Sequence, residues 1–159
     1  MLSDDNNCVL AFDSNLKLLW KVDVGNQIAA SIAYAADNRE VYAVTKVAIF
    51  KIKDYGTHGT IVWKATLDAY PGFEELNALT PTIVANGIAI SITAGVPIPS
   101  RGKNTLNFRY AVGLLDRETG HLRYVTNQVS PTHTSPTLDA NSPHPTCFVA
   151  NPRPRSQSP

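Results

Sequence analysis

The stretch DRETGHLRY, residues 116–124, decides the fold, because it joins two segments that have the pattern of β-strands. Residues 111–115 before it are apolar, and residues 122–126 alternate apolar and polar side chains with a period of two. Asp116 can accept hydrogen bonds from backbone N–H groups two or three residues later, and Gly120 can adopt a positive φ without steric cost. The stretch therefore predicts a β-hairpin whose aromatic residue, Tyr124, is buried.

Two earlier segments repeat this pattern. Residues 9–21 read VLAFDSNLKLLWK and residues 48–64 read AIFKIKDYGTHGTIVWK, so each has a strand, a turn that begins with aspartate, and a second strand with tryptophan. The spacing of the two tryptophans falls within the roughly 40 to 45 residues of a β-propeller blade, which usually has four strands. The sequence therefore predicts an all-β fold made of repeated antiparallel sheets.

Equivalent positions in the three copies carry the same kinds of residue. Each turn begins with an aspartate suited to capping backbone N–H groups, and each aromatic ring can fill the space between adjacent blades. In the first copy, Asn15 and Leu16 stand where the third copy has Thr119 and Gly120. The repeat positions are Asp13, Trp20, Asp54, Gly59, Trp63, Asp116, Gly120 and Tyr124. Because these residues recur, we interpret them as structural and not as catalytic.

The repeats divide the chain into two complete blades and two partial ones. Within a repeat region at 8–140, the expected units are a half blade at 8–24, a blade at 28–67, a blade at 78–127 with an insertion at 96–107, and a partial blade at 133–150. The flanks at 1–7 and 151–159 are polar or proline-rich, and we expect them to be disordered. The predicted fold is a partial β-propeller arc of four-stranded antiparallel blades.

Such an arc is too short to close a propeller ring, because open sheet edges disappear only when the last blade meets the first. Repeat units also bury their faces on their neighbours, so about three are needed for stability. The sequence therefore indicates a fragment of a larger propeller, with the remaining blades in the parent chain. A dimer or tetramer that completes the ring is the alternative.

The repeat resembles the A-x-D-x-x-T-G-x-x-x-W repeat of the pyrroloquinoline quinone-like β-propellers. The resemblance rests on Ala11-Phe12-Asp13 followed by Leu19-Trp20-Lys21, and on residues 116–120 followed by Arg123-Tyr124. Proteins of that superfamily include quinoprotein alcohol dehydrogenases, outer-membrane assembly scaffolds and luminal stress sensors. The resemblance implies a propeller fold and a location outside the cytoplasm, which is periplasmic, luminal or secreted.

Composition argues against several classes of function. The chain has 159 residues, 43% hydrophobic and 17% charged, with a net charge of +1. This charge gives no electrostatic reason for nucleic acid or an anionic membrane as a partner, and no apolar run reaches the roughly 20 residues of a spanning helix. Residues 1–7 lack the basic and apolar regions of a signal peptide. We interpret Cys8 and Cys147 as two thiols, with a disulfide as the alternative.

The remaining polar residues show no catalytic or metal-binding arrangement. Glu74 and Glu75 are adjacent, so on a strand they point to opposite faces and form no acid–base pair. No nucleophile elbow, phosphate loop or dinucleotide fingerprint occurs. The histidines lack the spacing of metal ligands; they are His58, His121, His133 and His144. We therefore expect no catalytic residue, no metal site and no evident cofactor.

The insertion at 96–107 departs from the repeat, and with its flank it carries positive charge at Arg101, Lys103 and Arg109. Loops on a rigid scaffold are common binding sites, so the insertion is a possible partner loop. A variable solvent loop without a binding role is the alternative.

Three hypotheses of function follow. The first is a noncatalytic propeller arc that acts as a scaffold or binds a protein partner. The second is a fragment of a pyrroloquinoline quinone-dependent alcohol or sugar dehydrogenase; by resemblance, such an enzyme holds its quinone and a calcium ion on the propeller axis with Glu, Asn and Asp ligands, often beside two adjacent cysteines. The third is a nonfunctional truncated product. We favour the first, because the sequence has no adjacent cysteines and no identifiable ligand set.

Overall fold

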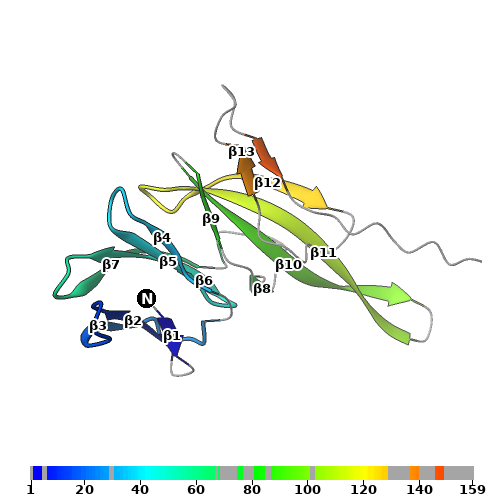
Figure 1. Cartoon of the computed structure of the whole chain (residues 1–159). Coiled ribbons are helices and arrows are strands. Elements are labelled where there is room, and N and C mark those ends of the chain that lie inside the picture. Colours follow the sequence, from blue (N-terminus) through cyan, green and yellow to red (C-terminus); the bar gives the residue numbers. More distant parts are fainter. Residues whose placement is uncertain are drawn as a thin grey trace, which may run out of the picture.

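The computed structural model describes residues 2–4, 7–28, 31–66, 68, 75–76, 81–84, 87–100, 103–128, 137–139 and 146–148. Over these residues the chain forms strands and turns and no α-helix. The strands are β1 (Leu2–Asp4), β2 (Cys8–Phe12), β3 (Leu18–Asp23), β4 (Ala33–Ala35), β5 (Glu40–Val44), β6 (Ala48–Asp54), β7 (Gly59–Thr66), β8 (Glu75–Leu76), β9 (Thr82–Val84), β10 (Gly87–Ser100), β11 (Lys103–Asp116), β12 (Leu122–Gln128), β13 (Thr137–Asp139) and β14 (Thr146–Phe148). Figure 1 shows them as a series of twisted sheets from which β10 and β11 project.

The second sheet is a complete four-stranded blade with the order β4-β5-β6-β7, all antiparallel. Its first strand, β4, has only three residues and begins at Ala33, five residues after the expected start of the blade at residue 28. Before it, Ile28 forms an isolated antiparallel bridge to Thr45. The expected blade at 28–67 is therefore present with a short inner strand.

The two faces of this blade contact different neighbours, because successive strand residues point to opposite sides. On β5 and β6, Val41, Ala43 and Phe50 pack in one buried cluster with residues of β2 and β3. Tyr42 and Ile49 pack in a second buried cluster with residues of β8, β10 and β11. The apolar runs of β5 and β6 thus provide both cores, and the blade lies between its neighbours as in a propeller.

The first sheet contains one strand more than the sequence predicts. The expected hairpin at 8–24 is present as β2 and β3, and β1 adds to it with Ser3 opposite Val9. Residues 2–4 are therefore a strand, so the expectation that 1–7 are disordered is wrong for them. The physical reason is that β2 would otherwise present an unpaired edge of backbone N–H and C=O groups.

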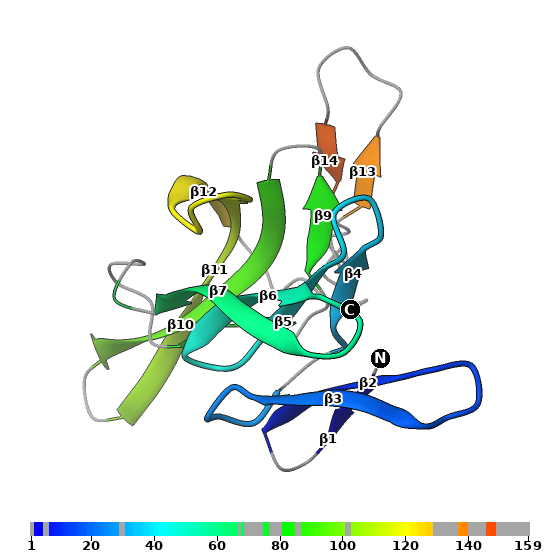
Figure 2. The ribbon, with the colours of Figure 1, turned by 90° about the vertical axis from the view of Figure 1, so that its left-hand side faces the viewer.

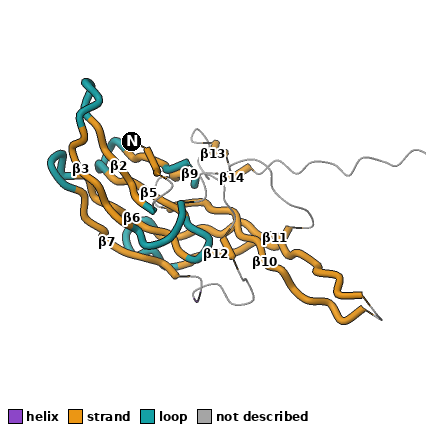
Figure 3. The backbone as a smooth tube through the Cα atoms, turned by 90° about the horizontal axis from the view of Figure 1, so that it is seen from below, coloured by secondary structure: helices purple, strands orange, loops and turns teal. Residues whose placement is uncertain are grey.

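The third sheet has the order β12-β11-β10-β8, with β9 also paired to β10. Its expected insertion at 96–107 is not an irregular loop. β10 and β11 continue as one antiparallel ladder from Gly87 opposite Asp116 to Ser100 opposite Lys103. Beyond Thr93 and Tyr110, these two strands pair with no other described strand. The segment from Ala94 to Arg109 is a two-stranded arm, which projects from the sheets in Figure 3.

The last two strands, β13 and β14, form an antiparallel pair with Leu138 opposite Cys147. They coincide with the partial blade expected at 133–150, whereas the tail at 151–159 lies outside the described residues. The short first strands of three successive units lie near one another, since β9 contacts both β4 and β13 (Figure 2). The units are therefore arranged around one side, with their short strands innermost.

The same irregularity occurs in all three outer hairpins. The strand register shifts by one residue just before the aromatic position, so that the extra residue is Leu19, Val62 and Arg123 in turn. A β-bulge of this kind increases local twist and bends the strand. Trp20, Trp63 and the backbone of Tyr124 thus occupy equivalent register positions.

Candidate functional site

Two interfaces join the three large sheets, and we call them the first joint and the second joint. The first joint lies between the β1–β3 sheet and the β4–β7 sheet, and the second lies between the β4–β7 sheet and the sheet of β8–β12. Both are built on an aromatic ring against a glycine. The polar site of the molecule lies in the second joint.

In the first joint, the Trp20 ring of β3 lies against Gly59 at the start of β7. A Cβ atom added to Gly59 would come within 2.9 Å of Cε3 and Cζ3 of Trp20 and of Cγ2 of Val22. The buried Trp20 also donates its Nε1–H to Oδ1 of Asp54 over 2.9 Å. Glycine is therefore needed here for close approach of the ring, not for a positive φ.

In the second joint, the Trp63 ring of β7 lies against Gly120 in the turn after β11. Gly120 has φ +72°, and an added Cβ would come within 2.8 Å of Cδ2 and Cε3 of Trp63. Trp63 donates its Nε1–H to the carbonyl oxygen of Arg117 over 3.2 Å. Gly120 thus serves both the turn and the contact between blades.

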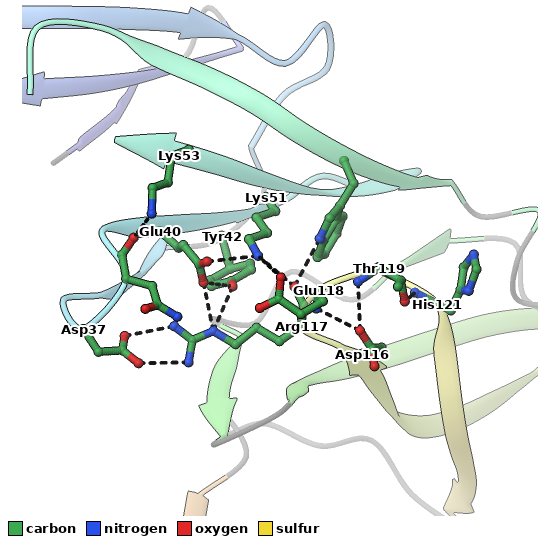
Figure 4. A network of polar contacts seen from close by, with 12 residues as sticks. Asp37, Glu40, Tyr42, Lys51, Lys53, Asp116, Arg117, Glu118, Thr119 and His121 are labelled. Carbon is green, nitrogen blue, oxygen red and sulfur yellow. Dashed lines mark hydrogen bonds and ion pairs between the residues drawn. The ribbon is translucent and has the colours of Figure 1, made fainter. Parts of the chain in front are cut away.

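Arg117 extends from this turn into the preceding blade, where it is buried (Figure 4). Its Nε donates to Oε2 of Glu40 at 2.8 Å and to the Tyr42 hydroxyl at 3.2 Å. Its terminal nitrogens make a bidentate contact with the Asp37 carboxylate at 2.9 and 3.1 Å. Bidentate pairing fixes the guanidinium plane as well as its charge. One side chain therefore binds β5 and the turn between β4 and β5.

Lys51 completes this cluster from β6. Its Nζ lies 3.0 Å from Oε1 of Glu40, and it donates to the carbonyl oxygen of Arg117 over 3.0 Å. The Tyr42 hydroxyl donates to Oε2 of Glu40 over 2.6 Å. We call Asp37, Glu40, Tyr42, Lys51 and Arg117 the charge cluster. Its buried charges are paired and hydrogen-bonded, as charges removed from water must be.

The charge cluster shifts the protonation of its members. Burial alone would raise the pKa of Glu40, but hydrogen bonds from Tyr42, Lys51 and Arg117 outweigh burial and hold that pKa below its usual value. Burial and the hydrogen bond to Glu40 raise the pKa of Tyr42 well above its usual value. The hydrogen bond to Asp37 raises the pKa of Arg117; burial opposes this effect, and the hydrogen bond to Glu40 adds to it. Glu40 is ionised and Tyr42 neutral at neutral pH, so neither is set up to exchange a proton there.

The three repeat aspartates accept backbone N–H groups of their own turns. Asp13 accepts from residues 15 and 17, Asp54 accepts from residue 56, and Asp116 accepts from residues 118 and 119. The bond from Thr119 and the pairing with Arg123 lower the pKa of Asp116. For Asp54, burial is outweighed by hydrogen bonds from Gly56, Trp20 and Arg39, so its pKa is also lowered. Asp54 therefore connects its turn to the first joint.

The structure describes only some of the other sequence candidates. Lys103 and Arg109 are on β11, on a strand and not on the loop that the sequence predicts, and Arg101 lies outside the described residues. The described histidines are exposed: His58 stacks on Tyr55, and His121 follows the Gly120 turn. The side chain of Tyr124, with His133, His144 and Glu74, lies outside the described residues. The arm residues are thus not part of the charge cluster.

Further candidates for chemistry are few. Cys8 is a buried thiol, and the side chain of Cys147 is outside the described part. Among the described residues, no three His, Cys, Asp or Glu side chains are grouped as they would be around a metal ion. The same residues include no helix of the length and apolarity that crossing a membrane requires.

The sequence analysis did not identify the charge cluster. It places Arg117 in the stretch that begins with Asp116 and Lys51 in the second copy of the repeat, and it assigns no role to Glu40 or Tyr42. One signal was available: Lys51 interrupts the apolar run from Ala48 to Ile52, where a buried lysine requires a partner. The partner could not be identified, because Arg117 is distant in sequence and reaches Lys51 only when the blades stack.

Antiparallel sheets that stack face to face, with short strands innermost, define a partial β-propeller of four-stranded blades. No family model and no curated protein matches the chain. Among solved structures, the chain is similar to the crystal structure of BamB from Moraxella catarrhalis, with a TM-score of 0.55 and 15% sequence identity. The likeness covers 87% of this chain and 40% of that one, so the chain spans about two fifths of that structure's length. At this identity, the likeness concerns the fold alone.

Proposed function

We propose that the chain is a noncatalytic part of a β-propeller, and that it acts as a scaffold or binds a protein partner in its parent protein. The observation that carries this proposal is the two-stranded arm from Ala94 to Arg109. The blades form the support, and the arm extends from one of them (Figure 3).

The arm is longer than blade formation requires. β10 and β11 have 14 residues each, whereas β6 and β7 in the complete blade have 7 and 8. An isolated two-stranded hairpin is marginally stable in water and gains stability when a third element covers it. A partner that packs on the arm would provide such cover.

The arm's composition is suited to a protein surface. Residues 96–99 read VPIP, and the basic residues Arg101, Lys103 and Arg109 follow. The buried centre of a protein interface is more apolar than the rest of the surface, and arginine is enriched in interfaces. We therefore assign these three basic residues to partner binding.

The polar groups within the joints support a structural function for the blades. The buried carboxylates Glu40 and Asp54 are each engaged by residues of a neighbouring blade, through Arg117 and Trp20. Groups used in this way hold sheets together and are not available to a substrate. By resemblance to the pyrroloquinoline quinone-like repeats, we place the parent protein outside the cytoplasm.

The test is to replace residues 94–109 by an Asn-Gly turn that joins Thr93 to Tyr110, which are opposite in register. The strand pairing within the blades remains, so folding should be unchanged. The yield of the crosslink that a partner forms with the intact chain in cells should fall at least tenfold. Arg101→Ala with Lys103→Ala and Arg109→Ala should weaken the same crosslink with the arm retained. Equal crosslinking of all three chains would contradict the proposal.

A thermal shift measurement addresses the alternative of a quinone-dependent dehydrogenase fragment. Pyrroloquinoline quinone with calcium should leave the melting temperature of the chain unchanged if the blades are noncatalytic. A ligand that binds only the folded state raises stability by an amount that grows with its concentration. A concentration-dependent rise in melting temperature would therefore favour the enzyme.

A further inference from the structure

β7 has features of a strand to which another strand can be added. It pairs with β6 on one side and with no described strand on the other. Its side chains Ile61 and Val62 are 39% and 52% exposed, so apolar surface is uncovered along this strand. An edge with unpaired N–H and C=O groups is a template for an extended chain.

A groove runs beside the end of this strand. It has a volume of about 420 Å³ and lies between residues 64–66 of β7 and residues 119–122 of the next blade. Its apolar lining residues are Ala65 and Leu122, and the remaining lining includes the polar residues Thr66, Thr119 and His121. A strand added beside residues 64–66 of β7 would therefore direct the side chains of one of its faces toward this groove.

The opposite face of β7 has a different character. Lys64 pairs in register with Phe50, and its Nζ lies 5.4 Å from the centre of the Phe50 ring. Ala65 pairs with Ile49 and points to the groove side. Residues of an added strand would thus meet a lysine on one face and, on the other, the groove that Ala65 and Leu122 help to line.

The charges near this edge select the partner's chemistry. Lys64 is exposed and is the only charged residue of β7, and the described residues that line the groove include His121 but no carboxylate. Opposite charges on directly facing strand residues are stabilising, and like charges are destabilising. A second copy's β7 would offer Lys64 no carboxylate, which argues against pairing of β7 with itself.

We propose that the free edge of β7 binds an extended segment of a protein partner as an added strand. The segment has an acidic side chain facing Lys64 and apolar side chains over the groove at 64–66 and 119–122. The inference rests on the proposed partner-binding function and assigns to it a second surface, separate from the arm.

The probe is a labelled peptide of eight residues, the length of β7, in which valine alternates with glutamate. Fluorescence anisotropy should detect binding to the intact chain, and amide shifts in NMR should map to β7. The same peptide with N-methylated backbone should not bind, because strand addition requires its N–H groups. Lys64→Glu should weaken binding by about fivefold and favour a valine–lysine peptide.

Lys17→Glu is the matched control, since Lys17 is an exposed lysine in the β2–β3 turn, and it should leave binding unchanged. Equal binding of the N-methylated peptide, or amide shifts confined to β12, would overturn the proposal. Self-association that shifts β7 amides on concentration would overturn it too, because the occupant would be a second copy. If the peptide fails but shortening the arm still removes the partner, only this inference falls.

Discussion

The first and second joints share one contact and differ in what surrounds it. In each, a tryptophan lies against a glycine of the next blade, with Trp20 on Gly59 and Trp63 on Gly120. In the first joint the indole N–H bonds to a carboxylate, that of Asp54, and in the second it bonds to a backbone carbonyl. The ring and the glycine are the constant elements, and the acceptor of the N–H can change.

The larger difference is the charge cluster, which has no counterpart among the described residues of the first joint. Trp63 pairs in register with Lys51, whereas Trp20 pairs with Ala11 at the equivalent place. The residue after the turn aspartate is Arg117 in the second joint and the exposed Tyr55 in the first. Lys51 and Arg117 are therefore two positions at which the joints differ, and the predictions below test what the charge cluster contributes to stability.

Removal of Glu40 should have the largest effect. Glu40→Ala leaves the buried Lys51 and Arg117 without their common carboxylate, and loss of one partner of a buried ion pair costs about 3–5 kcal/mol. Asp54→Ala in the first joint should cost about 1–2 kcal/mol, because it removes hydrogen bonds. The charge that it leaves without this carboxylate, Arg39, is half-exposed to solvent. Urea denaturation measures both. If both variants lose the same free energy of unfolding, the charge cluster contributes no more to stability than the hydrogen bonds of Asp54 do.

The glycines provide the next test. Gly120→Ala combines a ring contact at 2.8 Å with a positive φ, and should lower the free energy of unfolding by about 3 kcal/mol. Gly59→Ala meets Trp20 at 2.9 Å without a positive φ, and should cost about 2 kcal/mol.

Trp63→Phe with Gly120→Ala separates the two causes in the second joint. A smaller ring should relieve the contact and leave the backbone cost. If the double variant loses as much stability as the two single variants added together, contact with the Trp63 ring is not a cause of the loss in Gly120→Ala.

The sequence predicted the parts of this comparison that are local. The turn at Asp116, the glycine spacing and the equivalence of Trp20 with Trp63 can all be read from short segments, because capping and alternation depend on near neighbours. The charge cluster depends on stacking of distant segments, so Lys51 indicated that a partner was needed without indicating Arg117. More of the fold than of the charge cluster could therefore be predicted from the sequence.

The arm shows a second limit. The sequence analysis predicts a loop at 96–107, yet Pro97 and Pro99 lie in the β10–β11 ladder, opposite Leu106 and Asn104. Residues two apart direct their backbone groups to the same edge, so both missing N–H donors fall on one side of β10. A strand with one unpaired edge tolerates this, and no local rule indicates which edge is unpaired.

Loss of an indole N–H should have a smaller effect that differs between the joints. Trp20→Phe removes a buried donor to Asp54 and should cost about 1–2 kcal/mol beyond the change in ring size. Trp63→Phe should cost less from this bond, because Lys51 still donates to the Arg117 carbonyl. Thermal denaturation of the two variants gives the difference. A larger loss for Trp63→Phe would reverse the assignment of the stronger polar contact to the first joint.

The smallest expected effect is a gain in stability, from replacing Leu16. Leu16 donates its N–H to the Asp13 carbonyl as Gly120 does to that of Asp116, and it adopts φ +61° although it is not glycine. Leu16→Gly should relieve about 1 kcal/mol of backbone strain, less the entropy that glycine loses on folding, for a net gain of about 0.5 kcal/mol. The measurement is the midpoint of urea unfolding.

Leu16→Ala is the control for this gain, because it removes the 82% exposed side chain and keeps the Cβ atom that strains the backbone. It should give no gain. An equal gain from alanine would assign the effect to the exposed side chain and not to φ. The first turn would then tolerate its leucine at no backbone cost, and the equivalence of Leu16 with Gly120 would be one of hydrogen bonding alone.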